Sequence, residues 1–145
     1  MLIAPNVGRS PFGREIKMDY NEANKLLQGR NLLRRKLCNN TYLERWGHSI
    51  LEGQSYETIS IGLRLHGHEI MTFLPNGDTR LDSCGWRSVT TKDRLNRYMP
   101  RPFRITQKHW IWYLTRVEPP TYWDGPRWEF FNGITINDVG EVVND

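Results

Sequence analysis

The chain has 145 residues, of which 38% are hydrophobic and 25% are charged, and its formal net charge is +4. This length and composition predict one globular domain with its own core and exclude a disordered chain. The sequence lacks an apolar run near the ~20 residues that cross a bilayer, and its start does not follow the signal-peptide pattern. Two cysteines, Cys38 and Cys84, are too few for a secreted disulfide framework, so we expect reduced thiols in a cytosolic protein.

The first structural signal follows an irregular N-terminal stretch. Residues 1–18 hold two prolines and two glycines and show no periodicity, so we expect an N-terminal arm, with a single domain over residues 19–145. Asp19 and Glu22 have the spacing of a capping box, which predicts a helix that ends near Gly29.

The next part of the chain predicts extended structure. Residues 32–46 favour an extended segment interrupted at Asn39–Asn40, with a helix through Arg35 as the open alternative. In residues 58–66, TISIGLRLH, apolar and polar side chains alternate, which is typical of a strand. Gly67 then predicts a turn.

A β-hairpin is the clearest prediction in the middle of the chain. The runs EIMTFL and TRLDS flank PNGD at residues 75–78. Asn-Gly favours the two central positions of a type I′ turn, where both residues need positive φ. We therefore expect such a turn at Asn76 and Gly77.

A second helix is predicted next. Thr90 and Asp93 match a capping box, and Pro100 and Pro102 end the helical pattern. The residues expected to face inward are Leu95, Tyr98 and Met99.

The C-terminal third predicts short strands. FRITQ and WIWYLTRV flank a turn at Lys108–His109, and residues 119–126 form a loop. RWEFF, GITI and EVVN predict further short strands joined by glycine-containing turns. Residues 110–114 are apolar on both strand faces, which indicates a central strand or one that gives a face to a partner.

Together these elements predict an α+β fold. We expect a mostly antiparallel, hairpin-rich bent sheet or partial barrel with two short helices.

One block of the sequence carries a family resemblance. The block CGWRSVTTKDRLN at residues 84–96 is similar to a GGW-x-[ST]-V-TTK-x-R-[IL]-N pattern. Four further segments match, and they are Asn39–Leu43, Arg64–His66, Asn76–Gly77 and Asn132–Ile136. With these segments, about half of the chain resembles a family of small proteins of tailed bacteriophages.

The resemblance implies a phage protein, located in the cytoplasm of a bacterial host or in the virion. The family has no established activity, so no site residue follows from the resemblance. Cys84 stands where the family usually has glycine. If that glycine needs a positive φ, this chain must solve the turn differently.

Neither a cofactor nor a metal ion is expected. His66 and His68 lie two apart on one strand face, beside Glu69, but a site needs further ligands. His48, His109, Asp78 and Asp82 are candidates only by residue type.

Enzymatic chemistry is not expected either. Nucleophile-elbow, P-loop and dinucleotide-binding motifs are missing from the sequence. The surroundings of Cys84, next to Gly85 and near Arg87, could lower its pKa, and the alternative is an ordinary thiol. We therefore expect a binding protein.

The binding hypothesis follows from the distribution of charge. Residues 80–108 contain eight Lys and Arg against two acids, or +6, and residues 117–145 contain one Arg against six acids, or −5. A basic and aromatic set lies within 19 residues: Trp86, Arg87, Lys92, Arg94, Arg97, Tyr98, Arg101 and Arg104. Such cations can contact phosphates while an exposed ring stacks on a base.

The first predicted target is therefore nucleic acid, and this set forms its contact residues. The structural alternative is a solvated helix face with Trp86 in the core. A second basic cluster, Arg30 and Arg34–Lys36, either extends the patch or only solvates the surface. The functional alternative is a protein–protein module that inhibits a host or anti-phage defence complex, or a minor virion component. No membrane partner is expected.

Overall fold

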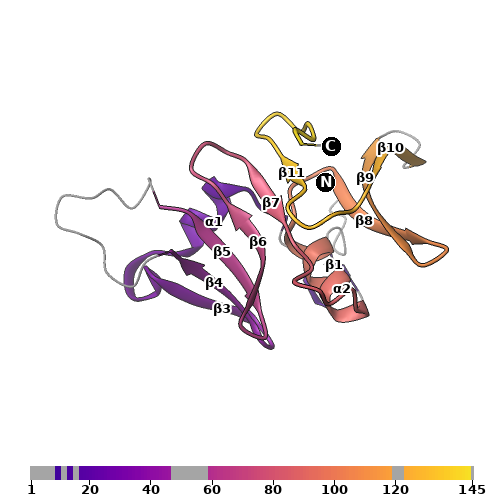
Figure 1. The fold of residues 1–145 in the computed structure, drawn as a ribbon. Coiled ribbons are helices and arrows are strands. Elements are labelled where there is room, and N and C mark those ends of the chain that lie inside the picture. Colours follow the sequence, from indigo (N-terminus) through magenta and orange to yellow (C-terminus); the bar gives the residue numbers. More distant parts are fainter. Residues whose placement is uncertain (1–8, 11–12, 15–16, 47–58, 119–122, 145) are drawn as a thin grey trace, which may run out of the picture.

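The fold is seen in a computed structural model that describes residues 9–10, 13–14, 17–46, 59–118 and 123–144. Figure 1 shows strands gathered into two separate groups, with the second helix between them. The α+β class predicted from the sequence is confirmed.

The larger group is an antiparallel sheet with the strand order β11-β7-β6-β5-β4-β3. Its strands are β3 (Arg34–Cys38), β4 (Thr41–Arg45), β5 (Ile61–Leu65), β6 (His68–Phe73), β7 (Thr79–Leu81) and β11 (Thr135–Ile136). Within the alternating segment at 58–66, Ile61–Leu65 form β5 at the middle of this sheet, and residue 58 lies outside the described residues. Most of residues 32–46 is extended, with a turn at Asn39–Asn40 as predicted, and the helix through Arg35 is wrong because this segment pairs as the β3–β4 hairpin.

The smaller group is an antiparallel sheet with the order β10-β9-β8. It contains β8 (Phe103–Lys108), β9 (Ile111–Glu118) and β10 (Trp123–Glu129). Residues 111–114 of the apolar segment 110–114 therefore lie in the central strand of this sheet, as one alternative predicted. The loop expected at 119–126 is corrected in its second half, where β10 begins at Trp123 and bulges between Asp124 and Arg127. Its first half, 119–122, lies outside the described residues.

The strands form separate sheets where the sequence predicted one bent sheet, because α2 and the residues after it lie between the two groups of strands. The sheets also do not close into a barrel. A short pair, β1 (Arg9–Ser10) and β2 (Gly13–Arg14), lies within the predicted arm. Met18, which the sequence placed at the end of that arm, is buried in the core.

The helices begin at side-chain caps. Helix α1 (Tyr20–Leu26) starts after Asp19, whose Oδ1 accepts from the backbone N–H of Glu22 at 3.0 Å, as predicted. Helix α2 (Val89–Tyr98) is capped by Ser88, and the assignment of the cap to Thr90 is wrong. Ser88 Oγ accepts from the backbone N–H of Thr91 at 3.2 Å, so the helix starts before Thr90.

Turn geometry also departs from the sequence prediction. The β6–β7 hairpin is confirmed, but the type I′ turn at Asn76–Gly77 is wrong, because only Gly77 has a positive φ, +98°. The turn is a three-residue loop from Pro75 to Gly77, closed by a 2.8 Å bond from the N–H of Leu74 to the carbonyl of Asp78. Positive φ at both central residues occurs instead at His66–Gly67, between β5 and β6.

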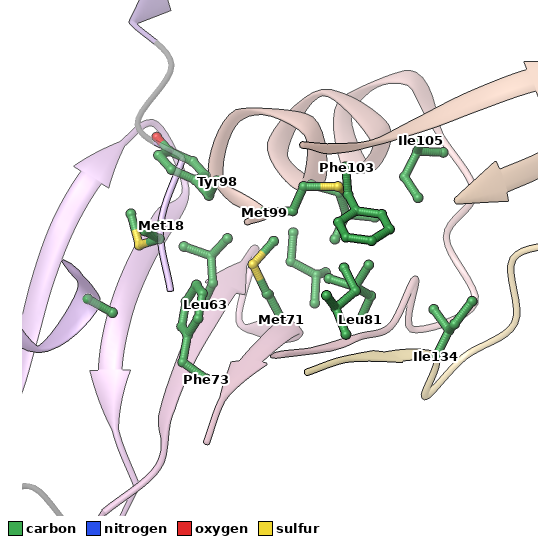
Figure 2. Close-up of a cluster of buried hydrophobic side chains, with 14 of the residues drawn as sticks. Met18, Leu63, Met71, Phe73, Leu81, Tyr98, Met99, Phe103, Ile105 and Ile134 are labelled. Carbon is green, nitrogen blue, oxygen red and sulfur yellow. The ribbon is translucent and has the colours of Figure 1, made fainter. Parts of the chain in front are cut away.

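The core lies between the larger sheet and α2 and continues under the smaller sheet. Figure 2 shows Tyr98, the last residue of α2, and Met99, which follows it, above Leu63 and Met71 of the sheet, with Phe103 of β8 beside them. Leu95 and Met99 are fully buried, and Tyr98 is 2% exposed, so the predicted inward face of α2 is confirmed. The helix therefore joins both sheets through its C-terminal half.

Candidate functional site

The predicted basic and aromatic set is divided between the surface and the interior. Trp86 is 63% exposed, and Arg87, Arg101 and Arg104 are also exposed, while Lys92 is partly buried. The alternative that placed Trp86 in the core is thereby wrong. Arg97 is only 6% exposed and Tyr98 is buried, and Arg94 is partly buried. Only part of the set can meet a ligand in this conformation.

The inward-facing arginines share one carboxylate. Arg97 Nε lies 3.0 Å from Asp93 Oδ2, and Arg94 is paired with the same carboxylate. Arg94 Nε also donates to Thr41 Oγ1 on β4 at 2.9 Å. Because both guanidinium groups are held by partners inside the protein, they serve to attach α2 to the larger sheet.

This cluster contains a thiol that the sequence did not single out. Cys38 Sγ lies 3.3 Å from the hydroxyl of Tyr98 and 3.8 Å from Arg97 Nη1. Burial alone would raise the pKa of Cys38, but hydrogen bonds from Thr41 and Tyr98, with the charges of Arg94 and Arg97, lower it. Burial, with the neighbouring thiol, raises the pKa of Tyr98. Cys38 is 60 residues from Tyr98 in sequence, so no local pattern could have indicated the pair.

The other cysteine behaves in the opposite way. Burial and the carboxylates of Asp82 and Glu69 raise the pKa of Cys84. The lowered pKa considered for Cys84 from its sequence neighbours is therefore wrong. Its Sγ donates to the backbone carbonyl of Glu69 at 3.0 Å, which also favours the protonated thiol.

The segment before α2 is folded so that Trp86 projects into solvent. A turn over Ser83–Trp86 is closed by a 2.8 Å bond from the N–H of Trp86 to the carbonyl of Ser83. Its two central residues, Cys84 and Gly85, both have positive φ, +54° and +80°. Cys84 therefore adopts a left-handed conformation, aided by a bond from its N–H to Asp82 Oδ1 at 2.7 Å.

A cavity of about 360 Å³ lies beside the Trp86 ring, between the β5–β6 turn and the start of α2. The ring centroids of His68 and Trp86 are 6.5 Å apart, with the planes tilted by 40°. The other residues that line the cavity are Leu65, His66, Ile70, Ser83, Ser88, Thr90 and Thr91. We call this the Trp86 cavity. None of the lining residues in the described part of the chain is acidic.

Two cations of the predicted set lie between α2 and the smaller sheet. Arg87 Nη2 donates to the carbonyl of Phe130 at 3.2 Å, and its guanidinium lies 5.3 Å from the Phe130 ring centroid. Lys92 Nζ donates to Gln107 Oε1 on β8 at 2.9 Å. Both side chains retain exposed surface, so both can also meet a ligand's phosphate.

The other exposed members of the set lie beyond the far end of α2. The helix has 10 residues and is thus about 15 Å long, so Arg101 is remote from Trp86. Arg101 lines a second cavity of about 530 Å³, together with the acidic side chains of Asp19, Glu22 and Asp138. Arg104 is exposed on β8. The eight residues consequently do not form one face.

The second basic cluster lies elsewhere again. Arg34, Arg35 and Lys36 are exposed on β3, the outermost strand of the larger sheet, and Arg30 precedes them. The Arg34 guanidinium lies 4.0 Å from the Tyr42 ring centroid, and Arg34 also pairs with Glu44. The cluster therefore does not extend the surface around Trp86.

The histidines do not gather ligands for a metal. Among the residues that the structure describes, no group of three or more His, Cys, Asp or Glu side chains could hold a metal ion. His66 is in the turn, and His48 lies outside the described residues. No helix in the described part of the chain is long and apolar enough to span a membrane.

A further exposed aromatic was missed by the sequence analysis, which placed Trp110 in a strand. Trp110 is 89% exposed at the tip of the β8–β9 hairpin. The strands pair up to Lys108 and Ile111, which leaves His109–Trp110 as the two-residue turn. The turn was predicted one residue too early because it contains neither glycine nor asparagine.

These features define a small α+β protein with two main antiparallel sheets and a solvent-facing tryptophan beside a cavity whose described lining residues include no acidic side chain. Comparison with known protein families matches residues 39–137 to the Kyanoviridae Gp96 protein family. The match covers more than half of the chain, so the protein belongs to this family of phage proteins. The phage origin implied by the sequence resemblance is thus confirmed, and its context is an infected host cell or a virion. No curated protein and no solved structure matches the chain.

Proposed function

We propose that this phage protein is a non-enzymatic protein that binds nucleic acid through the surface around Trp86. The observation that supports the proposal most is the 63% exposure of the Trp86 side chain next to an open cavity. An indole ring offers a stacking face for a base, and this use tolerates any base sequence. Aromatic residues are also enriched in binding interfaces relative to the rest of the protein surface.

The contact residues are fewer than the sequence predicted. Of the predicted cations, Arg87 and Lys92 remain available near the start of α2, while Arg94, Arg97 and Tyr98 are occupied in the interior. Two phosphate contacts give a log–log salt slope of about −1.4 on single strands and about −1.8 on duplex DNA. This slope is shallow, so binding is expected to be only moderately sensitive to salt.

The test is a binding titration of labelled oligonucleotides at two salt concentrations. Arg87→Glu is expected to weaken binding to all sequences alike, because phosphate contacts carry no base information. The matched control is Arg30→Glu, which changes the net charge equally at an exposed position before β3. Equal effects of the two variants would assign the affinity to net charge alone. The absence of binding at micromolar protein in low salt would refute the proposal.

A second candidate function is a protein–protein module that uses the tip of the β8–β9 hairpin. His109 and Trp110 have φ values of +51° and +69°, and left-handed backbone costs about 1–2 kcal/mol for a residue other than glycine. Trp110 also exposes almost its whole ring. Strain and exposure at one tip favour a role for these side chains in contacting a host, defence or virion protein.

The two candidate functions are separated by variants of Trp86 and Trp110. If a protein partner is recovered from infected cells by the wild type and not by Trp110→Ala, the hairpin tip is the binding surface. Trp86→Ala should keep that partner. Nucleic-acid binding should show the reverse dependence on the two residues.

A further inference from the structure

We infer that the Trp86 cavity receives a single unpaired base, so that the preferred ligand is single-stranded nucleic acid. This inference rests on the proposed nucleic-acid-binding function and specifies which form of nucleic acid is bound. Three features of the cavity support the inference: its shape, its charge and the polar groups in its lining.

The shape suits a flat ring. The Trp86 ring forms one wall, and His68 lies across from it with a centroid separation of 6.5 Å. The floor is apolar, since Leu65 and Ile70 are buried side chains in the lining. A base that stacks on Trp86 would therefore leave water for an apolar and aromatic surface. In a duplex the base faces are covered by neighbouring pairs, and reaching the cavity would require unstacking.

The charge of the lining distinguishes this cavity from the larger one. The Trp86 cavity contains no carboxylate among its lining residues, and Arg87 follows Trp86 directly. The 530 Å³ cavity has the carboxylates of Asp19, Glu22 and Asp138, which repel a phosphodiester chain. Although it is larger and is also lined by Lys17 and Arg101, its three acidic residues outnumber these two cations, so that cavity does not suit a polyanion.

The polar groups at the rim suit the edge of a base. Ser88 and Ser83 are occupied, because Ser88 caps α2 and Ser83 Oγ donates to Asn132 Oδ1 at 2.8 Å. Within the described residues, the side chains of His66, His68 and Thr90 make no hydrogen bond. Each neutral imidazole offers one donor and one acceptor, and the hydroxyl offers both. These groups can satisfy the polar edge of a base that enters the cavity.

The experiment compares three ligands by fluorescence anisotropy. They are a labelled single strand of about 12 nucleotides, a duplex of the same sequence, and a single strand of equal length built from abasic sites. The wild type should bind the intact single strand best, and it should lose most of its affinity for the abasic strand, because only the stacking is removed.

Variants then assign the preference to the cavity. Trp86→Ala should weaken single-strand binding by about 5- to 150-fold, the effect of losing one stacked base, and should change duplex binding less than twofold. Trp86→Phe should retain most of the single-strand affinity. Trp110→Ala is the matched control and should have no effect. Melting curves of each variant confirm that the fold is kept.

The outcomes separate this inference from the proposed function. Equal affinity for the single strand and the duplex, equally reduced by Trp86→Ala, would overturn the base cavity and leave nucleic-acid binding in place. Abasic strands bound as tightly as intact ones would do the same. If the wild type binds none of the three ligands, the proposed function itself fails.

Discussion

An aromatic residue and an arginine are neighbours in sequence both just before α2 and at its C-terminal end, but the two pairs differ in exposure. At the N-terminal end, Trp86 and Arg87 are exposed, and Val89 is 73% exposed. At the C-terminal end, Arg97 and Tyr98 are buried against the larger sheet. An aromatic next to an arginine is thus a surface feature at one end and part of the core at the other.

The difference arises from what each end contacts. Thr91, Leu95 and Tyr98 lie on one face of the helix and are buried, and the C-terminal half continues this face into the core. Asp93 then provides the carboxylate that allows Arg97 to be buried. Among the residues that the structure describes, no acidic side chain pairs with Arg87, which donates to a backbone carbonyl at the edge of the smaller sheet. Pairing inside the protein, rather than residue type, decides which cations stay available.

The largest expected effect concerns the two aromatic residues. Tyr98→Ala should lower the free energy of unfolding by about 3–5 kcal/mol, because it leaves a cavity in the core. Trp86→Ala should change it by no more than about 0.5 kcal/mol, because an exposed ring contributes little. Urea denaturation of both variants measures the difference. Similar losses in the two variants would contradict the contrast between the ends of α2.

Replacing the arginine at the buried end of α2 should likewise cost more stability than replacing the one at the exposed end, but both losses should be smaller than for Tyr98. Arg97→Ala should cost about 1–3 kcal/mol, since it removes one of the two partners of the partly buried Asp93 carboxylate. Arg87→Ala is the control at the exposed end and should cost less. A double-mutant cycle with Asp93→Ala measures the coupling of Arg97 to the carboxylate, and additive effects would show that the pair is not coupled.

The residue at which α2 begins can be tested by changing its N-cap. Ser88→Ala should destabilise the protein by about 1 kcal/mol, because it removes the acceptor for the N–H of Thr91. Thr90→Ala removes a hydroxyl that makes no cap and should have a smaller effect on the melting temperature. The reverse order would restore the boundary expected from the sequence.

The cysteines should show the smallest effect on stability, and the pH dependence of this effect has opposite signs at Cys38 and Cys84. Cys38 lies at the buried end with a lowered pKa, so its stabilising contribution is present above its unfolded pKa and is lost as pH falls through the folded value. Cys84 precedes the exposed end with a raised pKa, so its contribution is present at low pH and is lost as pH rises through the folded value.

Alkylation by iodoacetamide between about pH 6 and pH 10 measures this difference, because the thiolate is the reacting form. Single Cys38→Ala and Cys84→Ala variants report each thiol alone. The rate at Cys38 should reach half its maximum at a lower pH than the rate at Cys84. Coincident pH profiles would contradict the two opposite environments.

Local patterns predicted the parts of the fold that depend on neighbouring residues. The alternation at 58–66 predicted β5, and the spacing of Asp19 and Glu22 predicted the start of α1. The family resemblance likewise depended on short segments, and the family match covers them all. The sequence predictions fail where two nearby residues both match the pattern of the same structural feature. Ser88 and Thr90 are both good caps, and only the hydrogen bond identifies Ser88.

The candidate site could be predicted only in part, because its exposure depends on distant contacts. Arg94 is held by Thr41, 53 residues away, and Tyr98 meets Cys38 from β3. Neither contact has a signature in the basic segment itself. Trp110 was missed for a different reason, since its turn lacks the residues that normally favour positive φ.

The outer strand β3 has a consequence for how copies of the chain meet. An unpaired strand edge is a template on which another chain can add, and repeated addition leads to fibres. Here a second copy that paired along β3 would bring Arg34, Arg35 and Lys36 against the same three cations, and like charges oppose that pairing. The other edge, β11, is partly covered by a bridge between Ile136 and Val142. The larger sheet is therefore protected at both edges against the addition of further strands, although it does not close into a barrel.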